Sequence, residues 1–398
     1  MFSICLGCSN PNAVSVSVNF EGASAENITV VSADEIRFSL RPDPVGQERL
    51  WFYFRVNSPT PISPQFILDN PSDAHFGNWD VVRPVFSTDG KNWVRAVDTG
   101  LGWDDSILSK LKAKIRGDKP VFRFRSPVVA KQLWVAYSYP YTSVDLKHFL
   151  DTIRSDKRVQ FSTIGRSEDG REIELVTIDD SSAATSTTRQ EIWIVCREHP
   201  GETPASFVME GVVKAVLDRA VGGKLLAKYR VHIVPILNVD GMINGNYYRN
   251  TKGIDLAQDW GSFKSAEVRA LFEAMRGGLE SEHVALFFNL HSANYPENHF
   301  FLKMPEGRLP ANLLDLQRKL IQASVGIHPQ LQVNKSVEFW DYPEIQANYL
   351  NTKYGVYCFT SESNYNVGAN GSVVTPASLR KLGAAFVGVL STVLVDSI

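Results

Sequence analysis

A change of hydrophobic pattern near residue 143 constrains the fold of this chain more than any other feature of its sequence. Before it, short alternating or aromatic runs are separated by turn signals such as Asn70-Pro71 and Asp89-Gly90. This pattern is typical of an all-β sandwich. After it, apolar runs of strand length alternate with runs of helix length, as in a mixed or parallel sheet covered by helices. We therefore expect an all-β sandwich domain at 1–142 and an α/β domain at 143–398.

The pattern also predicts the individual elements. Strands of the first half are expected at 14–20, 35–40, 50–56, 82–86, 121–124 and 133–137. Strands of the second half are expected at 191–196, 230–237, 284–290 and 356–360. Helices are expected at 144–153, 204–219, 265–275, 310–325 and 375–395. In sheets of this kind, ligands gather beyond the carboxyl ends of the strands, so functional residues are expected there.

The charge balance and the apolar runs exclude some classes of partner. Lys plus Arg number 41 against 43 for Asp plus Glu, so the basic surplus of a nucleic-acid-binding protein is missing. The longest apolar stretch, 382–395, is shorter than the roughly 20 residues that span a bilayer, and it predicts a buried helix. The first basic residue is Arg37, which does not fit a secretory signal. We expect a cytoplasmic protein without nucleic-acid or membrane partners.

The four cysteines are too few for a disulfide framework in a chain of 398 residues. Cys196 and Cys358 lie in apolar runs and are expected to be buried thiols. Cys5 and Cys8 form a C-x-x-C pair without the further ligands of a zinc knot. We interpret them as a stray terminal pair, with a redox role as the alternative.

The strongest chemical signal follows the expected strand at 191–196. His199 and Glu202 stand three residues apart in a Pro-Gly turn, and a helix is expected to open with Thr203 as its cap. The alternative is a surface loop with a capping carboxylate. The position at a strand end favours a metal site, because both side chains can reach one ion.

A third ligand is expected from another strand end. The apolar run from Leu286 ends in His291, which alone would suit a structural histidine. Together with His199 and Glu202 it completes a set of two imidazoles and one carboxylate. Such a set leaves a fourth position for water and is typical of catalytic zinc, as in carboxypeptidase A. The sequence thus predicts one zinc ion per chain.

Three further residues are candidates for the chemistry. Glu362 ends the apolar run at 356–360 and would be the general base that activates the water. Arg249 could polarise a substrate carbonyl, and Asp255 could accept a hydrogen bond from a zinc histidine. For Arg249 and Asp255 a structural role fits the spacing equally well.

Taken together, these motifs resemble the metallocarboxypeptidase family, and specifically its cytosolic carboxypeptidase-like branch. The resemblance rests on the runs at 51–56, 140–142, 165–171, 199–203, 209–211 and 359–362, with Trp93 and Ser206. It implies an antiparallel β-sandwich followed by an α/β domain with a mixed eight-stranded sheet. It also implies the zinc ligands His199, Glu202 and His291, with Glu362 as general acid and base. Arg249 then takes the carbonyl-polarising position, and Asp255 the position behind the first zinc histidine.

One segment departs from the family pattern. The family usually reads Asp-Leu-Asn-Arg, and its Asn and Arg bind the free C-terminal carboxylate of the substrate; in this chain Ala257 and Gln258 stand in their places. Neither can form a charge-assisted bond to a carboxylate. Lys252 or Lys264 could substitute, or the substrate has no free carboxylate there. Asn246 and Tyr342 are further candidates for contacting substrate, the latter as the mobile tyrosine of classical members.

The leading hypothesis is a zinc-dependent peptidase or amidase that acts on a peptide or protein. A non-catalytic zinc-binding protein is a second hypothesis, against which the presence of both Glu362 and Arg249 argues. A deacylase or esterase for a small acylated molecule is a third. Oligomeric state is not predicted.

Overall fold

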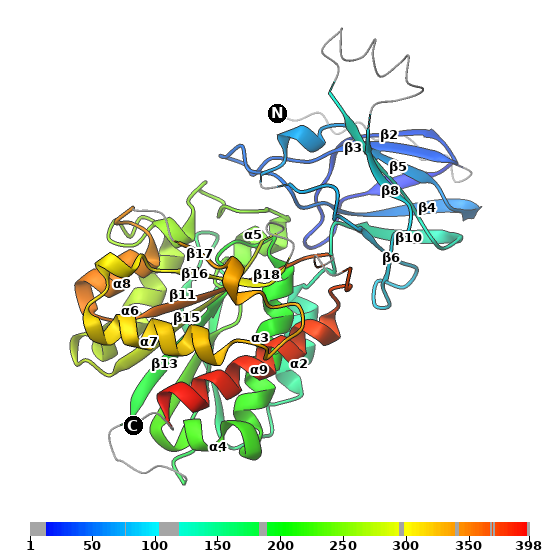
Figure 1. The fold of residues 1–398 in the computed structure, drawn as a ribbon. Coiled ribbons are helices and arrows are strands. Elements are labelled where there is room, and N and C mark those ends of the chain that lie inside the picture. The colour runs from blue at the N-terminus through cyan, green and yellow to red at the C-terminus, as the bar shows by residue number, and fades with distance from the viewer. Residues whose placement is uncertain are drawn as a thin grey trace. The chain divides into compact units, whose positions relative to one another are not determined.

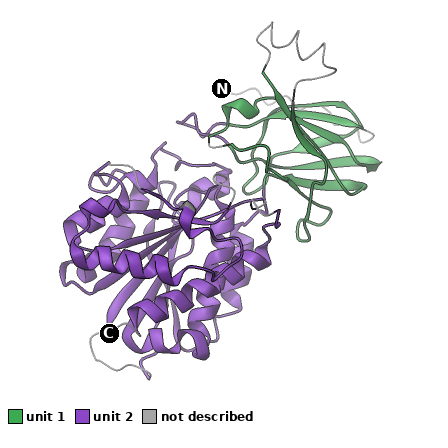
Figure 2. Ribbon diagram, in the orientation of Figure 1, with its two compact units in different colours: residues 1–41, 50–137 green, residues 42–49, 138–398 purple. Residues whose placement is uncertain are grey.

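The computed structural model describes residues 13–75, 77–102, 119–182, 189–293, 298–338, 342–366, 368 and 371–395. The chain forms two compact units (Figure 2). Unit 1 contains residues up to 41 and 50–137, and unit 2 contains 42–49 and 138 onward. The segment 42–49, which the sequence pattern places in the first half, thus belongs to the second unit. The Cys5–Cys8 pair lies outside the described residues.

Unit 1 is a sandwich of two five-stranded sheets, ordered β1-β4-β10-β6-β7 and β2-β3-β5-β9-β8. Neighbouring strands are antiparallel except β3 and β5, which run parallel. The bounds are β1 Ser15–Ser17, β2 Glu26–Ser32, β3 Glu35–Ser39, β4 Tyr53–Ile62, β5 Gln65–Leu68, β6 Val85–Ser87, β7 Val94–Arg95, β8 Thr99–Gly102, β9 Val121–Arg125 and β10 Ala130–Ala136.

The core of unit 1 is aromatic. Phe38 of β3 contacts Phe54 of β4 with ring centroids 5.0 Å apart, and Phe66 of β5 contacts Phe86 of β6 at 5.7 Å. These pairs join strands of opposite sheets, and all four rings are fully buried. The alternating aromatic residues of the sequence therefore form the interior of the sandwich.

Unit 2 is built on a mixed eight-stranded sheet, ordered β11-β12-β14-β13-β15-β18-β16-β17 (Figure 1). Its four central strands, β14, β13, β15 and β18, are parallel. The bounds are β11 Val159–Arg166, β12 Glu172–Ile178, β13 Gln190–Cys196, β14 Tyr229–Val234, β15 Val284–Ser292, β16 Phe300–Lys303, β17 Val337–Glu338 and β18 Cys358–Ser363. The predicted mixed α/β fold behind a β-sandwich is confirmed.

Helices pack on this sheet in two ways. Helices α3, α4 and α9 contact one another and α7 contacts α9, whereas α6 contacts β11 and β15 and α8 contacts β18 (Figure 1). The bounds are α2 Ser143–Asp151, α3 Thr203–Leu217, α4 Arg219–Lys228, α5 Val239–Asn244, α6 Ala266–Glu280, α7 Ala311–Ala323, α8 Gln346–Tyr354 and α9 Pro376–Leu394. Within the described residues α9 is long and apolar enough to cross a membrane by length and composition. Helix α9 packs along α3 and has ten buried residues, among them Leu382 and Phe386, as expected of a helix in the core of a folded domain.

The parallel centre of the sheet decides where functional side chains meet. Strands β13, β15 and β18 are neighbours in the order β13-β15-β18, and their carboxyl ends point to one edge. Chain segments that are far apart in sequence, near residues 199, 291 and 362, therefore come together at that edge.

Candidate metal centre

Three side chains converge at the carboxyl edge of the sheet. The Nδ1 atom of His199 lies 2.9 Å from Oε1 of Glu202, and Nδ1 of His291 lies 3.0 Å from Oε2 of Glu202. The two Nδ1 atoms are 3.2 Å apart. One ligand atom from each residue falls within a mutual spacing of 4.8 Å, and all three residues are buried. Distances of this order suit atoms that surround one metal ion.

A carboxylate behind each imidazole fixes which nitrogen faces the centre. Nε2 of His199 lies 3.1 Å from Oδ1 of Asp255, and Nε2 of His291 lies 3.0 Å from Oε2 of Glu198. Because a carboxylate accepts, each Nε2 can keep its proton toward the carboxylate behind it, and each Nδ1, which faces Glu202, would offer its lone pair once a metal replaces the proton there. This arrangement is compatible with the tautomers that a metal needs.

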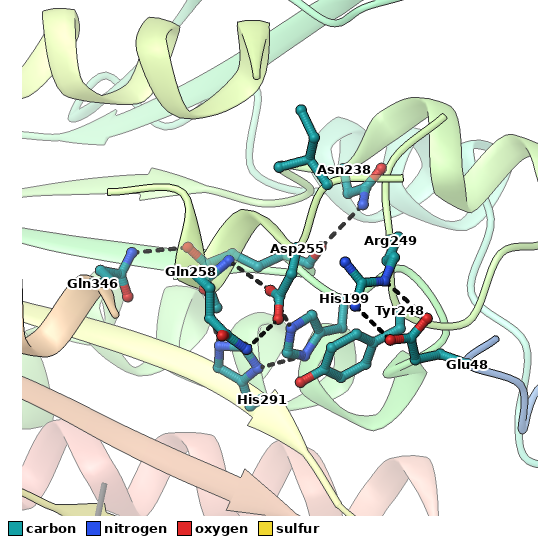
Figure 3. Close-up of polar contacts among 12 residues, drawn as sticks. Glu48, His199, Asn238, Tyr248, Arg249, Asp255, Gln258, His291 and Gln346 are labelled. Atoms are coloured by element: carbon teal, nitrogen blue, oxygen red, sulfur yellow. Dashed lines mark hydrogen bonds and ion pairs between the residues drawn. The ribbon is translucent and has the colours of Figure 1, made fainter. Parts of the chain in front are cut away.

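Asp255 is itself held by its own turn. It receives the backbone N–H of Ala257 at 3.0 Å and the side-chain amide of Gln258 at 2.6 Å (Figure 3). One N–H group of the Gln258 amide is thereby engaged by Asp255. In this chain Gln258 supports the carboxylate behind His199, whatever it contributes to substrate binding.

Glu198 is a functional residue that the sequence pattern did not indicate. It is fully buried, and besides His291 its carboxylate accepts from Nδ2 of Asn289 at 2.7 Å and from Nε2 of Gln346 at 2.8 Å. These partners come from β15 and α8. Since no fixed spacing links the three segments, the sequence alone carried no signal for this network.

The turn that carries His199 and Glu202 is stabilised by hydrogen bonds from the buried side chain of Arg197. Arg197, at the end of β13, adopts a positive φ of 60° and is buried. Its guanidinium donates to the Pro200 carbonyl and, at 3.0 Å, to the Ser206 hydroxyl. A left-handed arginine is strained, and such strain concentrates at functional sites.

The predicted cap of α3 is wrong. The helix begins at Thr203, so Glu202 occupies the cap position, and its side chain makes no capping bond. Instead the Glu202 carboxylate faces both histidines and accepts the backbone N–H of Ser292 at 2.8 Å. The carboxylate is thus free of the helix end and directed at the other two ligands.

Glu362 lies beside this cluster on β18. The register pairs it with His291 of β15 in a parallel ladder, so the two side chains emerge on the same face of the sheet. Among the described residues, its Oε2 is one of the buried atoms without a hydrogen-bond partner. Burial, followed by the charge of Glu202, raises the pKa of Glu362 to about 8, although the two histidines oppose the shift.

The acidic surroundings of the two histidines favour a cation. Burial lowers the pKa of His199, but the charges of Glu202 and Asp255 outweigh it and raise that pKa to about 9. The pKa of His291 is likewise raised well above its usual value by Glu202, with help from the bond to Glu198, against the effect of burial. A metal ion would satisfy the same negative field by displacing these protons.

The segment 246–249 forms another wall of the centre. The ring of Tyr248 stacks on that of His199, with centroids 3.8 Å apart and an interplanar angle of 19°. The adjacent Tyr247 carbonyl accepts the N–H of Gly201 at 2.8 Å, and a Cβ at Gly201 would lie 2.9 Å from Tyr247 backbone. Gly201 is therefore required for this close approach.

Arg249 and Asn246 are held within the same segment. Arg249 forms a two-pronged ion pair with Glu48, with Nε and Nη2 donating at 2.8 and 2.5 Å (Figure 3). Asn246 is buried and donates its side-chain amide to the Arg249 carbonyl at 3.0 Å. Asn246 thus shapes the loop that presents Arg249.

The remaining residues that the sequence suggests for substrate binding are either exposed or, in the case of Ala257, have a small apolar side chain. Tyr342 is 55% exposed, and Lys252 and Lys264 are exposed as well. Ala257 is half-buried in the short helix Leu256–Gln258. The predicted buried thiols, Cys196 and Cys358, are both free and buried.

Comparison with known proteins agrees with this geometry. Residues 16–137 match the cytosolic carboxypeptidase N-terminal domain, and residues 146–301 match the zinc carboxypeptidase family. Human cytosolic carboxypeptidase 6 is 35% identical over 254 residues, which are 61% of this chain and 48% of that protein. Cytosolic carboxypeptidase 6 of Caenorhabditis elegans is 26% identical over 253 residues, covering 61% and 53%. The chain spans about half the length of these curated relatives.

A solved structure shows the same fold over nearly the whole chain. The metallo-carboxypeptidase from Burkholderia cenocepacia superposes with a TM-score of 0.82 at 22% identity, covering 96% of this chain and 99% of that one. Both units are therefore shared with that protein at the level of the fold.

Proposed function

Because this chain belongs to the zinc metallocarboxypeptidase family and carries the N-terminal domain of its cytosolic branch, we propose that it hydrolyses a peptide or amide bond with one zinc ion. The observation that supports this most strongly is the convergence of His199, Glu202 and His291 at one point beside Glu362. Peptides or proteins are the proposed substrates, and the cytoplasm is the proposed location, as in the names of the relatives.

Zinc fits the donor atoms that the structure offers. Two imidazole nitrogens and one carboxylate are the ligand set of catalytic zinc sites, which keep a further position for water. The carboxylates behind each histidine set the tautomers that zinc requires. When bound, zinc supplies Lewis acidity, lowering the pKa of a water molecule and polarising a carbonyl.

The proton transfers fall to Glu362. Its Oε2, which has no hydrogen-bond partner among the described residues, can take a proton from the attacking water while the new C–O bond forms. When the C–N bond breaks, the same carboxyl group gives this proton to the departing nitrogen. The reaction then releases one carboxylic acid and one amine, and Glu362 returns to its starting state.

Arg249 stabilises the charge that develops on the carbonyl oxygen. Glu48 and the Gly253 carbonyl occupy three of its five N–H groups. The remaining two can donate to an oxygen that becomes negative during attack. Its side chain is 29% exposed, which leaves it reachable from outside.

The substrate is proposed to lack a free carboxylate beside the scissile bond. Ala257 offers no polar side chain, and the amide of Gln258 is engaged by Asp255. Positions 257 and 258, as the structure describes them, therefore offer a free C-terminus no cationic partner.

The test combines metal analysis with a peptide digest. We expect one zinc per chain in protein purified without chelator, and a large loss of zinc in His199→Ala and His291→Ala. The exposed His148→Ala is the matched control and should keep its zinc. A peptide-library digest read by mass spectrometry should show zinc-dependent cleavage. Equal zinc in all variants would refute the ligand set, and a zinc-bound protein that cleaves nothing would refute the activity.

A further inference from the structure

Residues 42–49 form a polar clasp on the loop that faces the metal centre. We call this segment the 42–49 clasp; it lies between β3 and β4 in sequence but belongs to unit 2. Asp43, only 2% exposed, accepts three successive backbone N–H groups. They come from Tyr247 at 2.7 Å, Tyr248 at 2.8 Å and Arg249 at 2.7 Å. One buried carboxylate thus fixes the backbone of the whole turn.

The other end of the clasp fixes a side chain. Glu48 binds Nε and Nη2 of Arg249, and Glu48 is itself only 14% exposed. A two-pronged pair sets both the position and the plane of the guanidinium. Nη1 is fixed in turn by the Gly253 carbonyl at 3.1 Å. The direction of the two remaining N–H groups is therefore set before any substrate arrives.

The pair also compensates the charge of Arg249. An isolated guanidinium binds a carboxylate strongly, whereas one already paired with Glu48 gains less from a second anion. It retains hydrogen-bond donors suited to a neutral carbonyl whose oxygen gains charge only during reaction. This agrees with a substrate that has no free carboxylate.

We propose that Asp43 and Glu48 are positioning residues of the centre. Asp43 holds Tyr248 against His199 and thereby supports the metal ligand. Glu48 aims a charge-compensated Arg249 at the substrate carbonyl, a role that rests on the proposed function. The Asp43 part depends only on the metal site.

Gly46 provides a way to disturb Glu48 without removing its charge. A Cβ at Gly46 would overlap Oε2 of Glu48 and lie 3.0 Å from Cδ of Arg249. The flexible carboxylate must therefore move away from the guanidinium. Gly46→Ala should reproduce the effect of Glu48→Gln. Because Gly46→Ala keeps the charge of Glu48, a shared effect would result from the lost contact with Arg249 and not from the lost charge.

The experiment uses the full chain with Asp43→Asn, Glu48→Gln and Gly46→Ala. The exposed Asp34→Asn serves as the control. Amide hydrogen exchange at residues 247–249 and the zinc dissociation constant are measured on all variants, neither of which needs catalysis. On a peptide that the wild type cleaves, kcat and KM are then measured separately.

For Asp43→Asn we expect exchange at residues 247–249 to accelerate at least tenfold and zinc affinity to fall about tenfold, the lower end for residues that orient a ligand. For Glu48→Gln and Gly46→Ala we expect unchanged zinc affinity, unchanged KM and a kcat about tenfold lower, because a misaimed donor acts on the transition state. Asp34→Asn should match the wild type throughout.

Two results would overturn the proposal in separate ways. Unchanged hydrogen exchange at residues 247–249 and unchanged zinc affinity in Asp43→Asn would refute the role of Asp43. Unchanged kcat in both Glu48→Gln and Gly46→Ala would refute the Glu48 part. If the wild type binds zinc but cleaves no peptide, the proposed function fails together with the Glu48 part, while the Asp43 result stands on its own.

Discussion

Glu362 carries a buried carboxylate oxygen, Oε2, that has no hydrogen-bond partner in the part of the chain that the structure describes. In Glu362→Gln the side chain keeps its shape but loses the ability to take up a proton. We expect turnover on an identified substrate to fall by a factor on the order of a hundred or more. Zinc content should not change, because Glu362 is not one of the three clustered ligands. Steady-state kinetics with metal analysis check this, and retained turnover would show that another group is the base.

Ala257 and Gln258 give a second residue-scale prediction. We expect weak release of single C-terminal residues from ordinary peptides by the wild type. Ala257→Asn with Gln258→Arg should raise this activity at least tenfold, equivalent to about 1.4 kcal/mol of barrier. Matched peptides with free and amidated C-termini provide the measurement. Brisk release by the wild type would show that a cation such as Lys252 binds the carboxylate. Gln258→Arg alone is the control for loss of the Asp255 contact.

The sequence was sufficient for the residues that end apolar strands. His199, Glu202, His291 and Glu362 could be singled out because each follows or ends a buried run, and the structure brings the first three together. Tyr248 and Glu198 could not be singled out, for a physical reason. Their importance depends on partners from other segments, such as the His199 ring under Tyr248, and no sequence spacing encodes those contacts.

At the scale of elements, the network around Glu198 joins the end of β13 to β15 and α8. In Glu198→Gln an amide replaces the carboxylate that orients His291. The new amide N–H groups would face the N–H donors of Asn289 and Gln346, so hydrogen bonds to Glu198 would be lost. We expect zinc affinity to fall about 10- to 100-fold, as for other groups behind a metal ligand. Competition with a fluorescent chelator measures this. The exposed Glu280→Gln on α6 should leave zinc affinity unchanged, and an equal affinity in both variants would contradict the role of Glu198.

The elements themselves were predicted unevenly. The long helices α3, α7 and α9 were predicted close to their observed bounds because their apolar pattern persists over many residues, whereas α6 extends to Glu280, five residues beyond its predicted end. Strands β5 and β8, with four residues each, gave no such signal. Strand β15 extends to Ser292, two residues beyond its predicted end, because its ladder with β18 continues through His291. A prediction that follows apolar residues ends the strand too early when its last residues are polar, as His291 and Ser292 are.

For the whole molecule, the two-part architecture followed from the sequence, but the assignment of 42–49 did not. Pro42 and Pro44 indicate only that the chain turns between two strands. Which unit the segment joins depends on Asp43 and Glu48 meeting residues about 200 positions later. Long-range pairing of this kind is invisible to local pattern.

Acid should destabilise the molecule partly through His299. Its ring is 1% exposed, its Nδ1 accepts the Asn364 N–H at 2.9 Å, and burial, then the nearby His328, lowers its pKa to about 3. The unfolded chain, with an ordinary histidine pKa near 6.5, binds the extra proton first. The contribution of His299 to the free energy of unfolding is therefore fully present above about pH 6.5. It is lost as the pH decreases toward 3, by up to about 1.4 kcal/mol per pH unit.

The variant His299→Gln tests this pH dependence. The glutamine carbonyl can accept the Asn364 N–H but binds no proton. We expect the decline in stability between pH 6.5 and pH 4 to be shallower in His299→Gln than in the wild type, as measured by urea unfolding of chelator-treated protein. The exposed His148→Gln should follow the wild type. Parallel curves for all three proteins would mean that His299 does not titrate as described.

The pairing of His291 with Glu362 across β15 and β18 has a consequence for how this centre can change. Main-chain hydrogen bonds hold neighbouring strands about 4.8 Å apart, so the interval between a ligand and the acid–base group is set by the ladder itself. Insertions or deletions in the connecting loops can alter access to the centre but not this interval. Only the length of the two side chains can change this interval. The surrounding loops are therefore open to redesign, whereas positions 291 and 362 accept few other side chains that could still bind the metal and transfer the proton.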